Sequence, residues 1–192
     1  MDRWSRPSRL RIQARRLSRG SYVRVDASGP SSRGGSLSLS LSRGRAILYG
    51  TLVVGALDLI DAMVFFGQRG VRPIRIFHSI AAGLLGRAPF QGGLATALLG
   101  AFLHFFIALA IVSVFYLAST RVRALTRHAV ISGLLYGVVA YTLMNLVVLP
   151  LSAAGRPTFP LPVLVNGLLI HMFGVGLPSA LFARAASTER SS

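Results

Sequence analysis

The chain has 192 residues, of which 53% are hydrophobic and 14% charged, and its 21 basic residues outnumber five acidic ones to give a net charge of +16. This composition excludes an ordinary soluble domain, and the absence of cysteine excludes a disulfide scaffold and a cysteine-ligated metal site. The length suits one domain with a tail.

The first 45 residues are a basic tail that contains 11 of the 21 arginines and much serine and glycine. We expect this tail to be disordered, because it cannot bury enough apolar surface to offset its ordering entropy. Its charge favours a cytoplasmic segment that binds anionic lipid headgroups. An extension without a role and an organelle transit peptide are the alternatives. The arginines are not interleaved with aromatic residues, so we expect no nucleic-acid partner.

Four long apolar runs each predict a membrane-spanning helix, at about residues 46–66, 94–118, 129–151 and 162–183. Each run has about 21–25 residues, enough to cross a hydrocarbon core of about 30 Å. The fold class is therefore all-α: an integral membrane four-helix bundle over residues 46–184, between the tail at 1–45 and a short C-terminal tail at 185–192.

The distribution of arginine predicts that both termini lie in the cytoplasm. In this orientation 16 arginines lie inside and five outside, as the positive-inside rule requires. Tyr49 and Tyr116 would then lie near the inner interface as belt residues. The loop at 67–93 conflicts with the rule, because it carries four arginines on the outer side: Arg69, Arg72, Arg75 and Arg87.

That loop also contains a short amphipathic helix, which Pro73 can begin and Gly86 can end. Its length is insufficient to span, so we expect it to lie in the outer interface, with re-entry into the bundle less favoured. The apolar residues that share one face are Ile74, Phe77, Ile80, Ala81, Leu84 and Leu85.

Two of the five acidic residues, Asp58 and Asp61, lie inside the first span and share one helix face. A charged Asp at mid-bilayer costs about 2.5–3.5 kcal/mol, so both side chains must face protein or water. A rise of about 1.5 Å per residue places one polar residue of each span at a similar depth. The members of this buried polar layer are Asp58, His104, Tyr141 and His171, with Asp61 and Asn145 as a second pair nearer the outside.

Two interpretations of this layer stay open. The polar groups can hydrogen-bond one another and fix the packing of the helices, as in many membrane bundles. Alternatively, they form a site that binds or passes a small solute or protons. In that case Asp58 is the central charge, His104 and His171 are its proton partners, and Asp61 and Asn145 line the outer approach.

Cofactor chemistry and catalysis receive less support. Two imidazoles and a carboxylate can bind a metal, but no metal-binding spacing is present, so we expect no metal. His104 and His171 at similar depths are the basis of a haem alternative with two axial histidines. The sequence has no nucleophile motif and no glycine-rich phosphate loop, so we expect neither a cofactor nor an enzyme.

Small residues predict close contacts between helices, within the bundle or between copies of the chain. Gly133-x-x-x-Gly137 lies in the third span, and the first contains two similar motifs, at 46–50 and 51–55. Pro178 removes the hydrogen bond to the carbonyl of Gly174, which predicts a kink close to His171.

Several segments resemble those of a group of uncharacterised small bacterial inner-membrane proteins with four spans. The segments are GALD at 55–58, AAGLLG at 81–86, QGG at 91–93, His104 and MNLVVLPLS at 144–152. The resemblance covers about residues 46–184 and implies the architecture and a bacterial cytoplasmic membrane, without supplying an activity. It argues against the transit peptide.

The function that we favour is non-enzymatic binding or passage of a small solute or protons, and the alternatives are a structural or assembly subunit of a membrane complex and a haem redox protein.

Overall fold

The structure is a computed structural model that describes residues 42–155, 158 and 160–187. The expectations for the tail at 1–41 therefore lie outside the described residues, as does Arg156. The described residues belong to one compact unit and form helices without any strand. The elements are α1 (Arg43–Gly67), α2 (Pro73–Leu85), η1 (Ala88–Gln91), α3 (Gly93–Arg121), α4 (Ala124–Arg127), α5 (Ala129–Leu143), η2 (Met144–Val148), α6 (Leu149–Leu151), α7 (Leu161–Ile170), η3 (His171–Gly176) and α8 (Leu177–Ser187).

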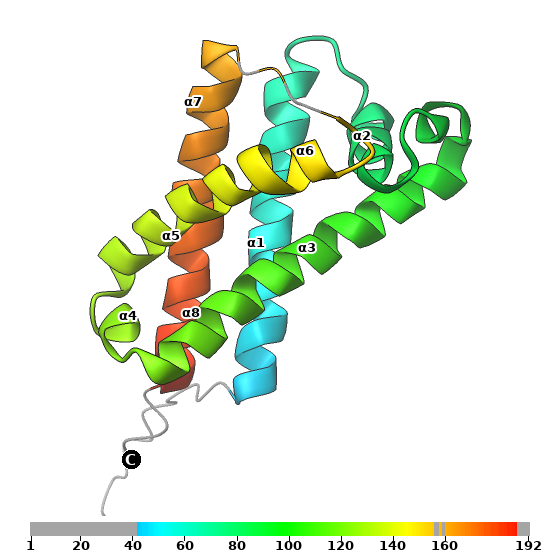
Figure 1. Cartoon of the computed structure of the whole chain (residues 1–192). Helices are drawn as coiled ribbons and strands as arrows, with labels where there is room; N and C mark the ends of the chain where they lie inside the picture. The colour runs from blue at the N-terminus through cyan, green and yellow to red at the C-terminus, as the bar shows by residue number, and fades with distance from the viewer. Residues whose placement is uncertain (1–41, 156–157, 159, 188–192) are drawn as a thin grey trace, which may run out of the picture. The chain divides into compact units, whose positions relative to one another are not determined.

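Four continuous helical stretches are long and apolar enough to cross a membrane: Arg43–Gly67, Gly93–Arg121, Ala129–Leu151 and Leu161–Ser187. They confirm the all-α class and the four predicted spans, and this chain is a polytopic membrane protein. The start of α1 and the end of α8 lie at one end of the described unit, and α2, α6 and the start of α7 lie at the other (Figure 1). We call the latter the α2 end.

The third and fourth spans each contain a π-helical segment, η2 and η3, followed by a Leu-Pro pair. Pro150 and Pro178 lack an N–H, and each ring would clash with a carbonyl of the preceding α-helical turn. The wider π turn accommodates this loss within a continuous helix. The irregular geometry lies where the Gly174–Pro178 kink was predicted, and a bend at that point stays a prediction.

Glycines allow α5 to approach η3 closely. A Cβ on Gly137 would collide with the carbonyl oxygen of His171, and one on Gly133 would lie 2.8 Å from the Cα of Leu177. In α1, a Cβ on Gly55 would lie 2.6 Å from the ring of Phe105 on α3. The small-residue motifs therefore serve packing within the chain, which was one of the two alternatives.

The α2 helix begins at Pro73, and Gly86, whose φ of 63° needs a glycine, follows its last residue, Leu85, as the sequence predicted. It packs against the first half of α3, where a Cβ on Gly100 would overlap the backbone of Phe77. Of the predicted apolar face only Ala81 is buried, whereas Ile74, Leu84 and Leu85 are exposed. The side chains of α2 that are buried against the protein are Ile76, His78, Ala81 and Ala82.

Two further polar side chains, Tyr116 and His78, are buried in the protein. Tyr116 is only 6% exposed and packs with Phe115 in the core, so the prediction that it is a belt residue is wrong, whereas Tyr49 is 45% exposed. His78 is buried between α2 and the start of α3, where its Nε2 atom donates to the carbonyl oxygen of Gly93 over 2.9 Å. Packing of α2 against α3, which depth alone does not predict, accounts for this burial.

Candidate functional site

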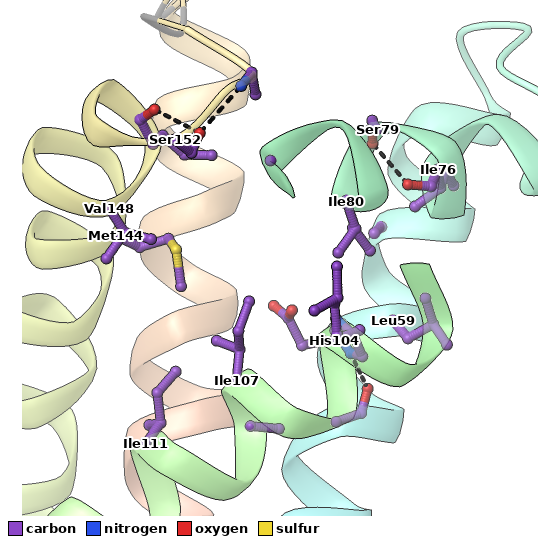
Figure 2. A pocket seen from close by; sticks show the side chains of 18 of the residues that line it. Leu59, Ile76, Ser79, Ile80, His104, Ile107, Ile111, Met144, Val148 and Ser152 are labelled. Atoms are coloured by element: carbon purple, nitrogen blue, oxygen red, sulfur yellow. Dashed lines mark hydrogen bonds between the residues drawn. The ribbon is translucent and has the colours of Figure 1, made fainter. Parts of the chain in front are cut away.

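A cavity of about 610 Å³ lies between α3 and the end of the third span. Tyr136 of α5 contacts α3 at one edge of this cavity, where its hydroxyl donates to the carbonyl oxygen of Ile111 over 2.7 Å. From there the cavity extends past Ile107 on α3 and Met144 on η2 toward the α2 end. Figure 2 shows Ile80 of α2 and Ser152 after α6 on its far side. We call this space the central cavity.

The central cavity is walled mainly by aliphatic side chains, and its polar groups come from few residues. Val54, Gly55 and Asp58 of α1 line it together with His171 and Val175 of η3. None of the described arginines lines it. An apolar enclosure with a few convergent polar groups is typical of small-molecule sites, and its volume falls within their usual range of about 300–1,000 Å³.

Asp58 and His171 form the polar pair of the central cavity. Asp58 Oδ1 lies 4.0 Å from His171 Nδ1, which is too long for a hydrogen bond, and the two side chains are 28% and 15% exposed. His171 Nδ1 instead donates to the carbonyl oxygen of Gly167 over 2.8 Å, which leaves Nε2 as the acceptor of the neutral ring. Within the described part of the chain, no group donates a hydrogen bond to Asp58.

His104 lines the same cavity from α3. Its Nε2 atom donates to the carbonyl oxygen of Gly55 over 2.8 Å, so this side chain ties α3 to α1 (Figure 2). Because that carbonyl lies one helical turn before Asp58, the polar layer predicted from depth does bring Asp58, His104 and His171 to one cavity. The fourth member, Tyr141, has its ring centroid 5.2 Å from that of His171.

A second cavity of about 200 Å³, which we call the small cavity, adjoins the central cavity. Asp58 and His171 line both cavities. The other polar residues that line the small cavity are Asp61, Tyr141, Asn145 and Asn166.

Asp61 and Asn145, the second pair predicted from depth, both line the small cavity. Asp61 Oδ2 accepts a hydrogen bond of 2.6 Å from Asn166 Nδ2, and Asn145 Nδ2 donates to the carbonyl oxygen of Tyr141 in its own helix. The sequence analysis did not identify Asn166, although its depth in the membrane is similar to that of Asp61. Asp61 and Asn166 lie about 9 Å and about 8 Å from the α2-end termini of their helices, given a rise of about 1.5 Å per residue.

Both π-helical segments carry members of the site. Asn145 lies in η2 and His171 in η3. Such segments are frequent at functional sites, because the extra residue turns side chains and carbonyls away from their α-helical positions. The glycine at 167 leaves room for the Tyr141 ring, since a Cβ there would lie 2.6 Å from its Cε2 atom.

Neither cofactor alternative gains support from this geometry. Among the described residues no group of three or more His, Cys, Asp or Glu side chains could hold a metal ion. The Nε2 atom of His104, which would have to ligate a haem iron, is engaged by Gly55. Comparison with family models, with curated proteins and with solved structures gave no match for this chain.

Proposed function

We propose that this membrane protein binds a small, largely apolar solute in the central cavity, with Asp58 and His171 as the polar anchor. One observation carries the proposal: the Asp58 carboxylate lies at the wall of a 610 Å³ cavity with no hydrogen-bond donor among the described residues. A carboxylate at membrane depth without a donor is costly. A ligand that brings an N–H or O–H to Asp58 removes that cost.

The relation of the two cavities supports passage as an extension of binding. Asp58 and His171 are the polar residues that line both the central cavity and the small cavity. A neutral His171 presents Nε2 as a proton acceptor, and Asp58 is the nearest carboxylate. Nε2 can therefore take a proton from the solvent or from a solute while Nδ1, the ring atom 4.0 Å from Asp58 Oδ1, gives its own proton to that carboxylate. We propose no bond-making chemistry, in keeping with a non-enzymatic role.

A structural or assembly subunit is the second candidate, and other contacts favour it. Three side chains bond between helices in ways that stabilise the bundle without any ligand: His104 to α1, Asn166 to Asp61 and Tyr136 to α3. Each such bond contributes on average about 0.6 kcal/mol in a membrane bundle. In this reading the central cavity is filled by lipid chains or by a partner.

The location of the protein is also a proposal. We propose the bacterial cytoplasmic membrane, by resemblance, with both termini inside. Counting the whole sequence, most arginines, including those of the 1–45 tail, then lie on the cytoplasmic side, where the tail binds anionic lipid.

The test uses the full chain in a non-ionic detergent, with aminoanthracene as the probe, because its fluorescence rises in apolar surroundings and its amine can donate to Asp58. We expect a saturable rise above the linear uptake by micelles. Ile107→Trp fills the cavity and should remove the saturable part, whereas Phe106→Trp should retain it, because Phe106 is 57% exposed and does not line the cavity.

Asp58→Asn separates the two candidate functions. The anchor role predicts that probe affinity falls by about tenfold, the usual effect of losing a hydrogen bond to a charged group, while the fold is retained. If binding is absent in the wild type, or if the two tryptophan variants behave alike, the solute site is refuted and the assembly role becomes the better explanation.

A further inference from the structure

The arginines of the 67–93 loop, which conflict with the positive-inside rule, gather around α2. The only acidic residues in the described part of the chain, Asp58 and Asp61, lie within α1, and Asp61 is bonded to Asn166. Arg69 is engaged locally, since its Nη1 atom donates to the carbonyl oxygen of Phe65 over 2.6 Å. Within the described residues, the positive charge around α2 therefore has no acidic counterpart.

Two of these arginines line a cavity. The space has a volume of about 590 Å³ and is bounded by Arg72, Arg75, Ser79 and Phe90 among others. We call it the arginine cavity. The guanidinium carbon of Arg75 lies 5.2 Å from the centroid of the Phe90 ring, a cation–π contact that restrains the head of this side chain.

The local sequence explains why these side chains converge. Arg72 is the residue that precedes α2, and Pro73 begins the helix. Positions 72, 75, 76 and 79 recur at helical spacing, so they share one face of α2, with both arginines at its start. The positive end of the helix dipole adds to the charge of the two guanidinium groups at this point.

The arginine cavity adjoins the central cavity. Phe66, Ile76 and Ser79 line both. The cationic groups at the α2 end and an apolar space therefore lie on either side of these three side chains. A ligand that fits a cationic cavity next to an apolar one has an oxyanion at one end and a hydrocarbon chain at the other.

We propose that Arg72 and Arg75 bind the oxyanion head of an acyl lipid, whose chain passes Ser79 into the central cavity. A phosphate or a carboxylate fits a pair of guanidinium groups, which offer paired N–H donors in one plane. An oxyanion attached to an acyl chain can come from two kinds of molecule, a membrane phospholipid and a free fatty acid. The headgroup site does not depend on the solute site at Asp58, although the chain and the solute would compete for the central cavity.

The experiment measures dissociation constants for the full chain in non-ionic micelles by titration calorimetry. The probes are palmitate, dioleoyl phosphatidylglycerol, inorganic phosphate and hexadecanol. About 0.5 M salt screens the diffuse attraction of the basic tail to anions. We expect at least one of the two acyl anions to bind at least tenfold more tightly than inorganic phosphate or hexadecanol.

The matched variants are Arg72→Gln and Arg75→Gln against Arg87→Gln, whose arginine lies in the same loop and does not line the cavity. Each cavity variant should weaken binding by about tenfold, as expected for loss of a charge-assisted bond, and the control should stay within about twofold. Binding of palmitate alone identifies a free carboxylate ligand, and binding of phosphatidylglycerol identifies a phospholipid. Equal losses in all three variants would overturn the proposal.

Ser79→Phe tests the path of the chain without removing a charge. Wild type should bind the long-chain form of its preferred anion more tightly than the short-chain form, palmitate against octanoate for a fatty acid and dioleoyl against dihexanoyl phosphatidylglycerol for a phospholipid. The variant should lose this preference while it still binds the short-chain form. The proposal is overturned if hexadecanol or phosphate binds as well as the acyl anions, or if the preference for the longer chain is absent in the wild type.

Discussion

The contact between α5 and η3 gives the sharpest stability prediction. In Gly137→Ala the new Cβ would overlap the carbonyl oxygen of His171 and lie 2.5 Å from the Cα of Met172. Both neighbours are backbone atoms of a packed helix, so no side chain can rotate away. The two helices must separate by about 1 Å to restore ordinary contact, and overpacking of this kind costs about 1–3 kcal/mol. We expect a loss of about 3 kcal/mol, because two backbone atoms are involved.

The assay is unfolding of the protein in mixed micelles by increasing dodecyl sulfate, followed by far-ultraviolet circular dichroism. The matched control is Gly44→Ala, because a Cβ at Gly44 in α1 meets nothing within 4 Å. That variant should be neutral, or stabilised by up to about 1 kcal/mol through the unfolded chain. If Gly137→Ala unfolds within about 0.5 kcal/mol of wild type, the close approach of α5 to η3 is wrong.

Three further predictions follow from the contacts of the polar side chains and the ends of the spans. Asp58→Asn should be at least as stable as wild type in the same micelles, because it removes a charge to which nothing described donates a hydrogen bond. Asn166→Leu should be less stable by about 0.6–1.7 kcal/mol, since it removes an interhelix bond. The reverse order would assign Asp58 to a structural network. Tyr136→Phe removes the hydrogen bond from the hydroxyl to α3 and should lower the free energy of unfolding by about 0.6 kcal/mol. If that free energy is unchanged, this bond does not hold the helices together. The natural chain has no cysteine, so a single introduced cysteine reports which side of the membrane it lies on when intact cells are labelled with an impermeant thiol reagent. Arg87→Cys should react and Thr126→Cys should not. Labelling of Thr126→Cys alone would reverse the proposed topology.

Hydropathy and helix-boundary residues were sufficient to place the helices along the chain. The third span matches its predicted range, and α2 begins at Pro73 and stops before Gly86 as expected. The reason is local: about 20 apolar residues must form a helix to cross a bilayer, and proline and glycine restrict the backbone at single positions. Depth along a helix is equally local, so the sequence also indicated which polar residues would share a layer.

The tertiary structure decided which polar groups meet and where space is left between the helices. Depth gives no rotation about the helix axis, so it could not show that Asp61 bonds to Asn166. The burial of Tyr116 and the position of the central cavity depend in the same way on how whole helices pack. Helix packing is set by many weak contacts and by close approaches such as that at Gly137, which join residues far apart in the chain.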